Sequence, residues 1–445
     1  MRRNRFVHFL TIMVAQCLLL FLMPQCTTEP PKDAKDANYL TFTAEADSTL
    51  FAIANIGGNH PDVQYSLDGG KTWTILTSDT LIYLVRKGDK ALLKGNNPKG
   101  FSKKERVYSI FYMEGSIAAS GSVMSLIDGK GITTKIPNSF CFKNLFRGPS
   151  LTQAPELPAK KLAGHCYEGM FEECINLTQA PQLPATKLAE ECYAGMFDYC
   201  INLTQAPQLP ATKLERYCYS GMFRECTNLK QAPQLPATKL AEGCYTGMFS
   251  QCYNLTQAPQ LPATKLEKYC YSGMFEECFE LTQAPQLPAT KLEKYCYEGM
   301  FWCCHSLTQA PQLPATKLEK YCYSGMFCWC NHLTQAPQLP ATKLENYCYR
   351  EMFSCCHSLT QAPELSAQTL ANGCYKKMFY DCTSLAEIKV GFTAWTKHNW
   401  FWGNESSTRS WLSGVAPNGK FICPQKLPKE FGKSRIPEGW KVIKN

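Results

Sequence analysis

Apolar and polar residues recur with a period of 26 residues over more than half of this chain. The pattern begins at Leu151, runs through nine uninterrupted copies and ends at Ser384. A unit this short cannot bury its own apolar face, so the copies must stack and share one core. The period therefore predicts a solenoid of nine coils over residues 151–384. The apolar positions of the second copy are Leu177, Ala180, Leu183, Leu188, Cys192, Tyr193, Met196, Phe197 and Cys200.

Each copy divides into an extended half and a half with helical spacing. Residues 177–184 contain two prolines, which cannot donate to a strand ladder, so only short strands are expected there. Cys192, Met196 and Cys200 follow at intervals of four, as on one face of a helix, whereas Glu191 falls on the other face. This alternation predicts an α/β repeat solenoid with the cross-section of a leucine-rich repeat.

The flanking regions predict further domains. Residues 38–125 alternate short β-rich runs with turn clusters, which indicates a small all-β domain like a β-sandwich, folding apart from the solenoid. Residues 126–150 contain a degenerate half-unit, in which Phe142 stands for the repeated tyrosine and Phe146 for the repeated phenylalanine; we expect an N-terminal cap. Residues 385–445 contain five tryptophans, enough aromatic bulk for a C-terminal cap, although a carbohydrate-stacking platform is an alternative.

The N-terminus indicates export. Residues 1–25 combine early arginines with an apolar run, as in a signal peptide, although a short membrane anchor is an alternative. Cys26 follows directly, and residues 26–37 form a polar tether. The segment 22–26 resembles a bacterial lipoprotein box, which makes Cys26 the candidate lipidation site. Cleavage and secretion without a lipid is the other reading.

The repeat resembles a known family of bacterial surface proteins, the BspA-like leucine-rich repeats. Two motifs carry this resemblance: Leu-Pro, at 157–158 through 339–340, and Phe-x-x-Cys, at 171–174 through 379–382. Leu-Pro-Ala-Thr makes the present unit a variant, and its period is longer than is usual in the family. The resemblance implies a leucine-rich repeat fold and a place at the cell surface or outer membrane.

The cysteines fit the stacked architecture as a ladder. Eighteen of the 25 form nine pairs eight residues apart. Across a helix, eight residues rise about 12 Å, beyond the ~7 Å limit for a disulfide, so pairing within a repeat is disfavoured. We expect buried thiols acting as small hydrophobes, with disulfides between neighbouring coils as the alternative. The ladder residues of the first two coils are Cys166, Cys174, Cys192, Cys200, Phe171 and Phe197.

Extra thiols and imidazoles gather in coils six to eight. They are soft metal-ligand types, but they occupy different positions in their repeats, so no regular ligand set is implied and no metal site or cofactor is predicted. Variation at tolerant surface positions is the favoured explanation. These residues are Cys303, Cys328, Cys355, His305, His332 and His357.

Charge and motifs argue against nucleic-acid binding and catalysis. The repeat block holds 18 basic and 21 acidic side chains, so the net charge of +9 comes from the flanks and no basic face is evident. No catalytic constellation is recognisable, so we do not expect an enzyme. The segment 66–73 resembles the Asp-box of sialidases, where it shapes a turn; a glycan-active enzyme is accordingly the least favoured class.

The leading functional expectation is a cell-surface binding or adhesion protein held by a lipid anchor. It would present its solenoid to an unknown host or bacterial surface protein or glycan, without nucleic acid. Trp302, Trp329, Trp400 and Trp402 are the candidate binding surface. A structural spacer or surface-coat protein is the alternative, because the exposed Thr-Gln and Thr-Lys positions are nearly identical from copy to copy.

Overall fold

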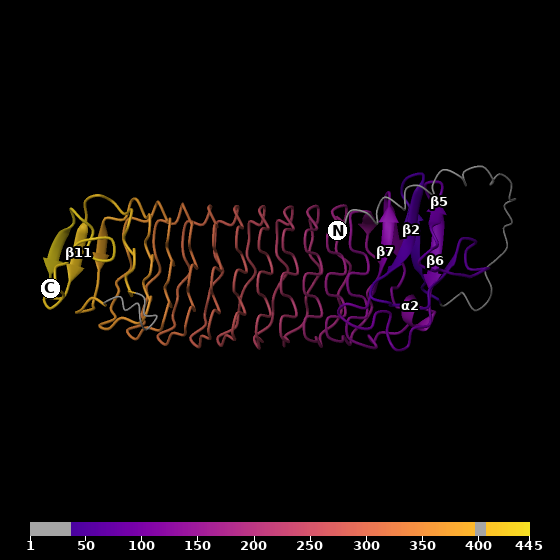
Figure 1. Cartoon of the computed structure of the whole chain (residues 1–445), viewed down its shortest axis with the longest axis horizontal. Coiled ribbons are helices and arrows are strands. Elements are labelled where there is room, and N and C mark those ends of the chain that lie inside the picture. Colours follow the sequence, from indigo (N-terminus) through magenta and orange to yellow (C-terminus); the bar gives the residue numbers. More distant parts are fainter. Residues whose placement is uncertain (1–36, 397–405) are drawn as a thin grey trace. The chain divides into compact units, whose positions relative to one another are not determined.

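The computed structural model describes residues 37–396 and 406–445, which form an N-terminal β domain, a long periodic repeat region and a C-terminal sheet (Figure 1). The predicted signal peptide, Cys26, Trp400 and Trp402 lie outside the described residues. Among the residues that are described, no helix has the length and apolar character needed to cross a bilayer.

The β domain consists of two sheets packed face to face. One sheet has the strand order β4 (Thr74–Ile75), β3 (Gln64–Ser66), β6 (Lys90–Lys94), β1 (Leu40–Ala44), β8 (Ile117–Ser120) and β9 (Leu151–Gln153). The other has the order β5 (Ile82–Leu84), β2 (Thr49–Asn55) and β7 (Ser109–Glu114), and α2 (Ser125–Asp128) follows β8. Phe42 meets Phe51 and Phe111 edge to face, with ring centroids 5.0 and 5.1 Å apart, so the aromatic core lies between the sheets.

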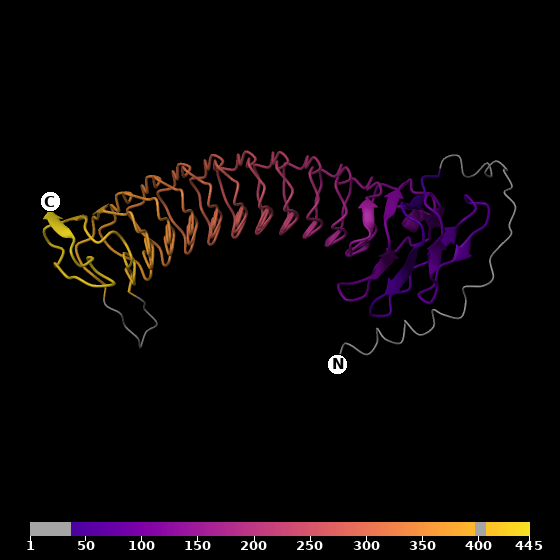
Figure 2. The same ribbon diagram turned by 90° about the horizontal axis from the view of Figure 1, so that it is seen from above.

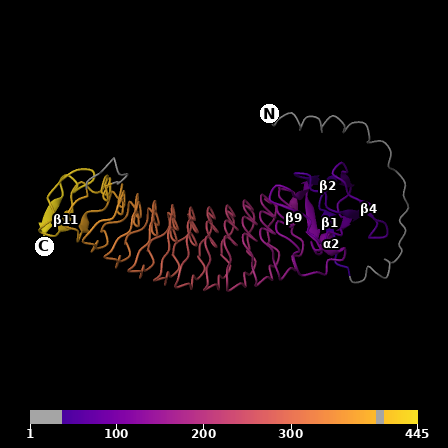
Figure 3. The ribbon, with the colours of Figure 1, turned by 60° about the horizontal axis from the view of Figure 1, so that its bottom comes forward.

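The β domain and the first coil share one sheet and one core. Strand β9, which is labelled in Figure 3 where the β domain meets the coils, opens the first coil. It pairs in parallel with β8. Phe111 of β7 stacks on Phe146 at 5.9 Å, and Phe146 stacks on Phe171 of the first coil at 5.6 Å. The apolar side chains of the β domain thus continue into the repeats without a break, and Asp36–Asn445 form one compact unit.

The repeats form a stack of similar coils, seen side by side in Figure 2. We number each coil from 1 to 26, starting at its first leucine, so that coil 1 begins at Leu151 and coil 2 at Leu177. The tyrosine at position 17 and the phenylalanine at position 21 are buried and stack on their counterparts in the next coil. In coils 2 and 3 the ring centroids are 5.8 Å apart for Tyr193–Tyr219 and 5.6 Å apart for Phe197–Phe223. The predicted stacking is confirmed.

The second half of each coil is not a helix, which corrects the α/β prediction. Throughout 151–384, where every residue is described, the chain forms turns and isolated bridges apart from β9. N–H groups at alternate positions bond in two directions: Tyr193 N–H donates to the Cys218 carbonyl of the next coil at 3.1 Å, whereas Ala194 N–H donates back to Glu191 at 3.2 Å. A helix would keep all these bonds within one segment, whereas here half of them join neighbouring coils.

The first half of each coil contributes single parallel bridges rather than continuous strands. Position 3 pairs with position 3 of the next coil, as in Gln179↔Gln205, and position 11 does the same, as in Lys161↔Lys187. The prolines at positions 5 and 8 have no N–H to donate, which explains why the ladder is interrupted between these bridges.

Both ends of the stack are covered by aromatic side chains. At the N-terminal end, Phe142 stacks on Tyr167 of coil 1 at 6.0 Å, as its place in the half-unit suggests. At the other end, the fully buried Trp411 lies 6.2 Å from Tyr375 of coil 9. A parallel sheet completes this end, with the order β10 (Glu387–Lys389), β11 (Lys420–Cys423) and β12 (Lys441–Lys444). Trp440 is buried here, so both tryptophans serve packing rather than sugar stacking.

Candidate interaction surface

The exposed side chains of the first half of the coil are nearly identical from coil to coil. In coil 2 the exposed positions 2, 3, 6, 10 and 11 are Thr178, Gln179, Gln182, Thr186 and Lys187. The same residue types recur in coils 3 to 8, with Lys230 at position 2 of coil 4 as the exception. We call these positions the uniform face. Its lysines are partly neutralised by nearby glutamates, for example Lys265 Nζ at 2.9 Å from Glu267 Oε1.

The second half of the coil carries the differences between coils. They fall at positions 13, 14, 15, 18, 22, 23, 25 and 26, which lie between the invariant core positions. We call these positions the variable face. Position 22, for example, is in coils 1 to 9 Glu172, Asp198, Arg224, Ser250, Glu276, Trp302, Cys328, Ser354 and Tyr380. The nine coils therefore present seven residue types at this position on the same backbone scaffold.

A shallow trough runs along the variable face of coils 1 to 5, with glycine at its floor. Position 19 is glycine in coils 1 to 7, at φ values near +60°, and an added Cβ at Gly221 or Gly325 would meet nothing within 4 Å. The same backbone conformation accepts Glu351 and Lys377 in coils 8 and 9, with φ values of 55° and 52°. Glycine thus leaves the floor open in coils 2, 3, 4, 6 and 7, whereas an added Cβ at Gly169 in coil 1 would lie 2.2 Å from Asn144 Oδ1. In coils 2 to 5 the trough is lined by positions 18, 19 and 22, from Gly195 to Glu276.

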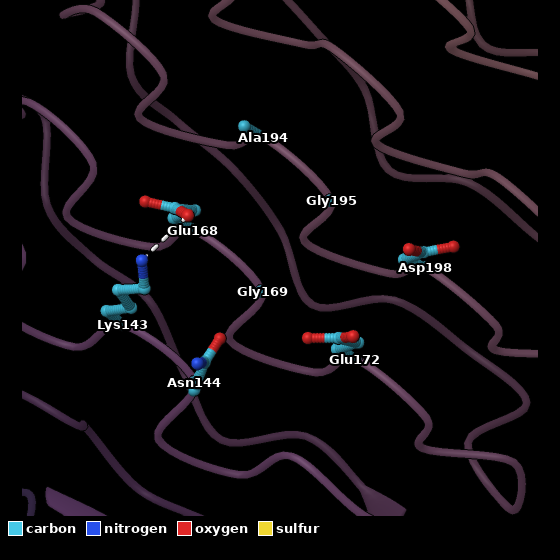
Figure 4. A pocket seen from close by; sticks show the side chains of 8 residues that line it. All are labelled: Lys143, Asn144, Glu168, Gly169, Glu172, Ala194, Gly195 and Asp198. Atoms are coloured by element: carbon cyan, nitrogen blue, oxygen red, sulfur yellow. Dashed lines mark hydrogen bonds and ion pairs between the residues drawn. The ribbon is translucent and has the colours of Figure 1, made fainter. Parts of the chain in front are cut away.

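The walls of the trough are polar and charged. At its N-terminal end, Glu168 and Glu172 stand on either side of the Gly169 backbone, with Asp198 of the next coil beyond (Figure 4). Lys143 Nζ lies 2.9 Å from Glu168 Oε1, and Arg224 binds Asp198 through both of its carboxylate oxygens. Burial raises the pKa of Glu172, a rise opposed by Arg147. These walls suit a partner with hydrogen-bonding or charged groups.

Two of the four tryptophans predicted to bind are exposed on the variable face. Trp302, at position 22 of coil 6, is 39% exposed, and Trp329, at position 23 of coil 7, is 41% exposed. Trp329 meets the edge of His357 at 6.1 Å. These two tryptophans make coils 6 and 7 the most apolar part of this face. Exposed tryptophans are frequent anchors in interfaces.

Tyrosines at position 15 form a surface row that was not predicted from the sequence. Tyr269, Tyr295, Tyr321 and Tyr347 of coils 5 to 8 stack face to face, with centroids 4.7 to 4.8 Å apart. Because each ring covers the face of the next, only the edges and hydroxyls remain for a partner. This row therefore suits hydrogen bonding better than stacking on a sugar ring. Its signal was the recurrence of tyrosine one residue before the invariant Cys-Tyr.

The two cysteine rows lie in the core, and all 23 described cysteines are free. Cys166, Cys174, Cys192 and Cys200 are fully buried, as are Phe171 and Phe197. The thiol at position 24 donates to the phenylalanine carbonyl of the preceding coil, as in Cys200 Sγ to Phe171 O at 3.1 Å. Burial raises the pKa of the ladder thiols, to about 12 at Cys244, so they stay protonated.

The extra thiols and imidazoles of coils 6 to 8 do not converge on a metal site. Cys303 N–H bonds to the Cys328 carbonyl at 2.8 Å, which places these two residues side by side on adjacent coils. The imidazoles bond elsewhere: His305 Nδ1 lies 2.9 Å from the Trp329 carbonyl, and His357 Nδ1 lies 3.0 Å from the Asp381 carbonyl. His332 is exposed. Among the described residues, these six form no group of three close ligand atoms.

The segment that resembles an Asp-box is a turn whose aspartate is fully engaged. Asp68 accepts hydrogen bonds from the Ser66 and Thr72 hydroxyls and from the backbone N–H groups of Lys71 and Thr72. The bonds from Thr72 lower the pKa of Asp68 most. Trp73 Nε1 donates to the Gly70 carbonyl at 3.1 Å. These contacts give Asp68 a structural role.

Comparison with known proteins produced no match: no family model, no curated protein and no solved structure matches this chain.

Proposed function

We propose that this chain is an exported, surface-exposed binding protein of the BspA-like leucine-rich repeat type, which holds a protein or glycan partner on the variable face of its solenoid. In this proposal Cys26 carries the lipid that keeps the protein at the outer membrane. The residues that contact the partner line the trough of coils 1 to 5 and continue along the same face to the exposed Trp302 and Trp329.

The contrast between the two exposed faces carries this proposal. The uniform face is the more exposed of the two and would drift at least as readily after duplication: on the variable face Asp198, Ser250 and Ser354 are buried, whereas Trp302 and Trp329 are exposed. Coils 2 to 8 nevertheless keep Thr-Gln and Thr-Lys on the uniform face while positions 15, 18, 22 and 23 change in character, size and charge. Side chains that change along the stack give a surface that differs from place to place, which suits specific recognition by a solenoid.

The resemblance of the repeat supports the cell-surface part of the proposal. Leu-Pro followed by Phe-x-x-Cys occurs in each of the first eight coils, and this combination resembles surface leucine-rich repeats. The early arginines, the apolar run and Cys26 suit export and lipidation.

A binding screen on the mature chain tests the proposal. Immobilised mucosal glycans and extracellular-matrix proteins serve as probes, and protease accessibility on intact cells reports whether the solenoid faces outward. We expect saturable binding to a member of the panel and cleavage of the chain on intact cells. A chain that is shielded on intact cells, or that binds nothing where a known adhesin binds, would refute the proposal.

A spacer or surface-coat role is the second candidate, favoured by the uniform face. Its rows of identical side chains, such as the glutamines at position 3, add regular inter-coil contacts without adding specificity. The two candidates differ in one respect: a spacer tolerates any soluble substitution on the variable face, whereas a binding protein does not.

A further inference from the structure

One group of three metal-ligand side chains converges in the described part of the chain, at the N-terminal end of the solenoid. His165 Nδ1 lies 3.0 Å from Glu168 Oε2 and 3.3 Å from Glu191 Oε2, and the three ligand atoms lie within 4.8 Å of one another. Their side chains are 24 to 33% exposed, so an ion can reach them from solvent. The imidazole distinguishes this group from the purely acidic clusters of the trough.

The two distances from His165 Nδ1 fit a small tetrahedral ion. Zinc binds histidine nitrogen and carboxylate oxygen at about 2.0–2.2 Å, which places neighbouring ligand atoms about 3.3 Å apart. The distances of 3.0 and 3.3 Å from His165 Nδ1 are close to this value, and the two carboxylate oxygens lie within 4.8 Å of each other. One nitrogen and two oxygens fill three corners of a tetrahedron and leave the fourth to water.

Neighbouring residues hold two of the three ligands in place. Lys143 Nζ binds Oε1 of Glu168 at 2.9 Å, as Figure 4 shows, which leaves Oε2 directed at the imidazole. Phe140 stacks on the His165 ring, with centroids 4.4 Å apart and an interplanar angle of 12°. Contacts of this kind outside the ligands fix their orientation and strengthen metal binding.

The repeated sequence pattern does not by itself bring three metal-ligand residues together. His165 and Glu191 occupy position 15 of coils 1 and 2, where five of the other seven coils have tyrosine and two have glycine. Glu168 occupies position 18, where the following four coils have Ala194, Ser220, Thr246 and Ser272. Histidine and glutamate therefore occur together at these positions only in coils 1 and 2, beside the N-terminal cap.

We propose that His165, Glu168 and Glu191 bind a divalent transition-metal ion, such as Zn²⁺, that links coils 1 and 2. The ion binds the Nδ1 lone pair, so any proton carried by that nitrogen passes to solvent on binding. The ion neutralises the two carboxylates and ties the start of the stack together, where coil 1 meets the cap.

Calorimetric titration of the full chain with Zn²⁺ tests this site. We expect one equivalent to bind and the melting temperature to rise with Zn²⁺ concentration, because the folded chain holds the ion. His165→Gln and Glu191→Gln should abolish both effects. Glu190→Gln is the matched control: it removes the adjacent carboxylate, which pairs with Arg216 at 3.0 Å, and should bind Zn²⁺ as the unaltered chain does.

The absorption spectrum of the Co²⁺-loaded chain distinguishes this site from the cysteines. A nitrogen and oxygen site gives no thiolate-to-cobalt charge-transfer band. Absence of binding, binding that survives His165→Gln, or a thiolate band lost on blocking Cys303 and Cys328 would each overturn the proposal. Circular dichroism of the metal-free variants shows that they remain folded.

Discussion

At the scale of single residues, the cysteine at position 24 combines small size with a hydrogen bond that its coil needs. Its thiol donates to the carbonyl of position 21 in the preceding coil, as Cys226 Sγ does to Phe197 O at 3.1 Å. A disulfide would remove this donor. The spacing of the pairs suggested buried thiols from sequence alone, but the bond between coils depends on a backbone path that the sequence did not reveal.

Thiol labelling checks this arrangement cysteine by cysteine. In the native chain at neutral pH, we expect a maleimide to leave the ladder unmodified and to react only slowly at Cys303 and Cys328. These two are partly exposed, but burial raises their pKa values to about 11 and about 12, so little thiolate is present. After denaturation without reductant, peptide mass spectrometry should find every described cysteine labelled. Disulfide-linked ladder peptides would contradict the prediction.

At the scale of elements, apolar residues four apart correctly predicted which side chains of the second half of each coil are buried. They did not predict its backbone conformation. Cys192, Met196 and Cys200 are all buried, as a helical reading requires. The missed signal was the glycine at position 19, in the middle of the supposed helix, where it disfavours helix. Positions 15, 19 and 23 adopt positive φ in successive coils, which turns alternate N–H groups toward the next coil.

Two glycine substitutions separate backbone strain from steric overlap. Gly221→Ala should lower the free energy of unfolding by about 1–2 kcal/mol, because φ is +58° and the added Cβ meets nothing. Gly243→Ala should cost clearly more, since its Cβ would lie 2.0 Å from a ring carbon of Tyr217. Urea denaturation measures both, with Gly325→Ala as a second open position. Equal losses at Gly221 and Gly243 would show that Tyr217 moves aside freely.

At the scale of the whole molecule, the β domain, nine coils and C-terminal sheet form a continuous core. The period predicted the stack and the half-unit at 136–150 predicted its cap, because both depend on local pattern. The join between β8 and β9 was not predictable in this way, since strand pairing across 30 intervening residues leaves no periodic signal. Likewise, Trp302 and Trp329 were found from residue type, whereas the trough needed the coil geometry.

Removing one aromatic side chain in the β domain should therefore loosen the first coils. Phe111→Ala takes away the ring that stacks on Phe146 and should destabilise the core by about 3–5 kcal/mol. Hydrogen exchange should accelerate in the β domain and in coil 1, and fade along the stack because coils contact only their neighbours. Phe353→Ala in coil 8 is the control, with faster exchange near the C-terminal end only. Faster exchange confined to the β domain after Phe111→Ala would contradict a shared core.

The proposed binding role is tested most directly by exchanging side chains between coils. Trp302→Ser and Trp329→Gln give coils 6 and 7 the residues of coil 4, Ser250 and Gln251, which this scaffold already accepts. The uniform-face control is Thr308→Ala with Gln309→Ala. Binding to the ligand found by the glycan and matrix-protein screen is measured for all three chains. We predict at least a tenfold weaker affinity for the exchanged chain, about 1.4 kcal/mol, and unchanged affinity for the control. Equal affinity of the exchanged and original chains would contradict recognition by the variable face.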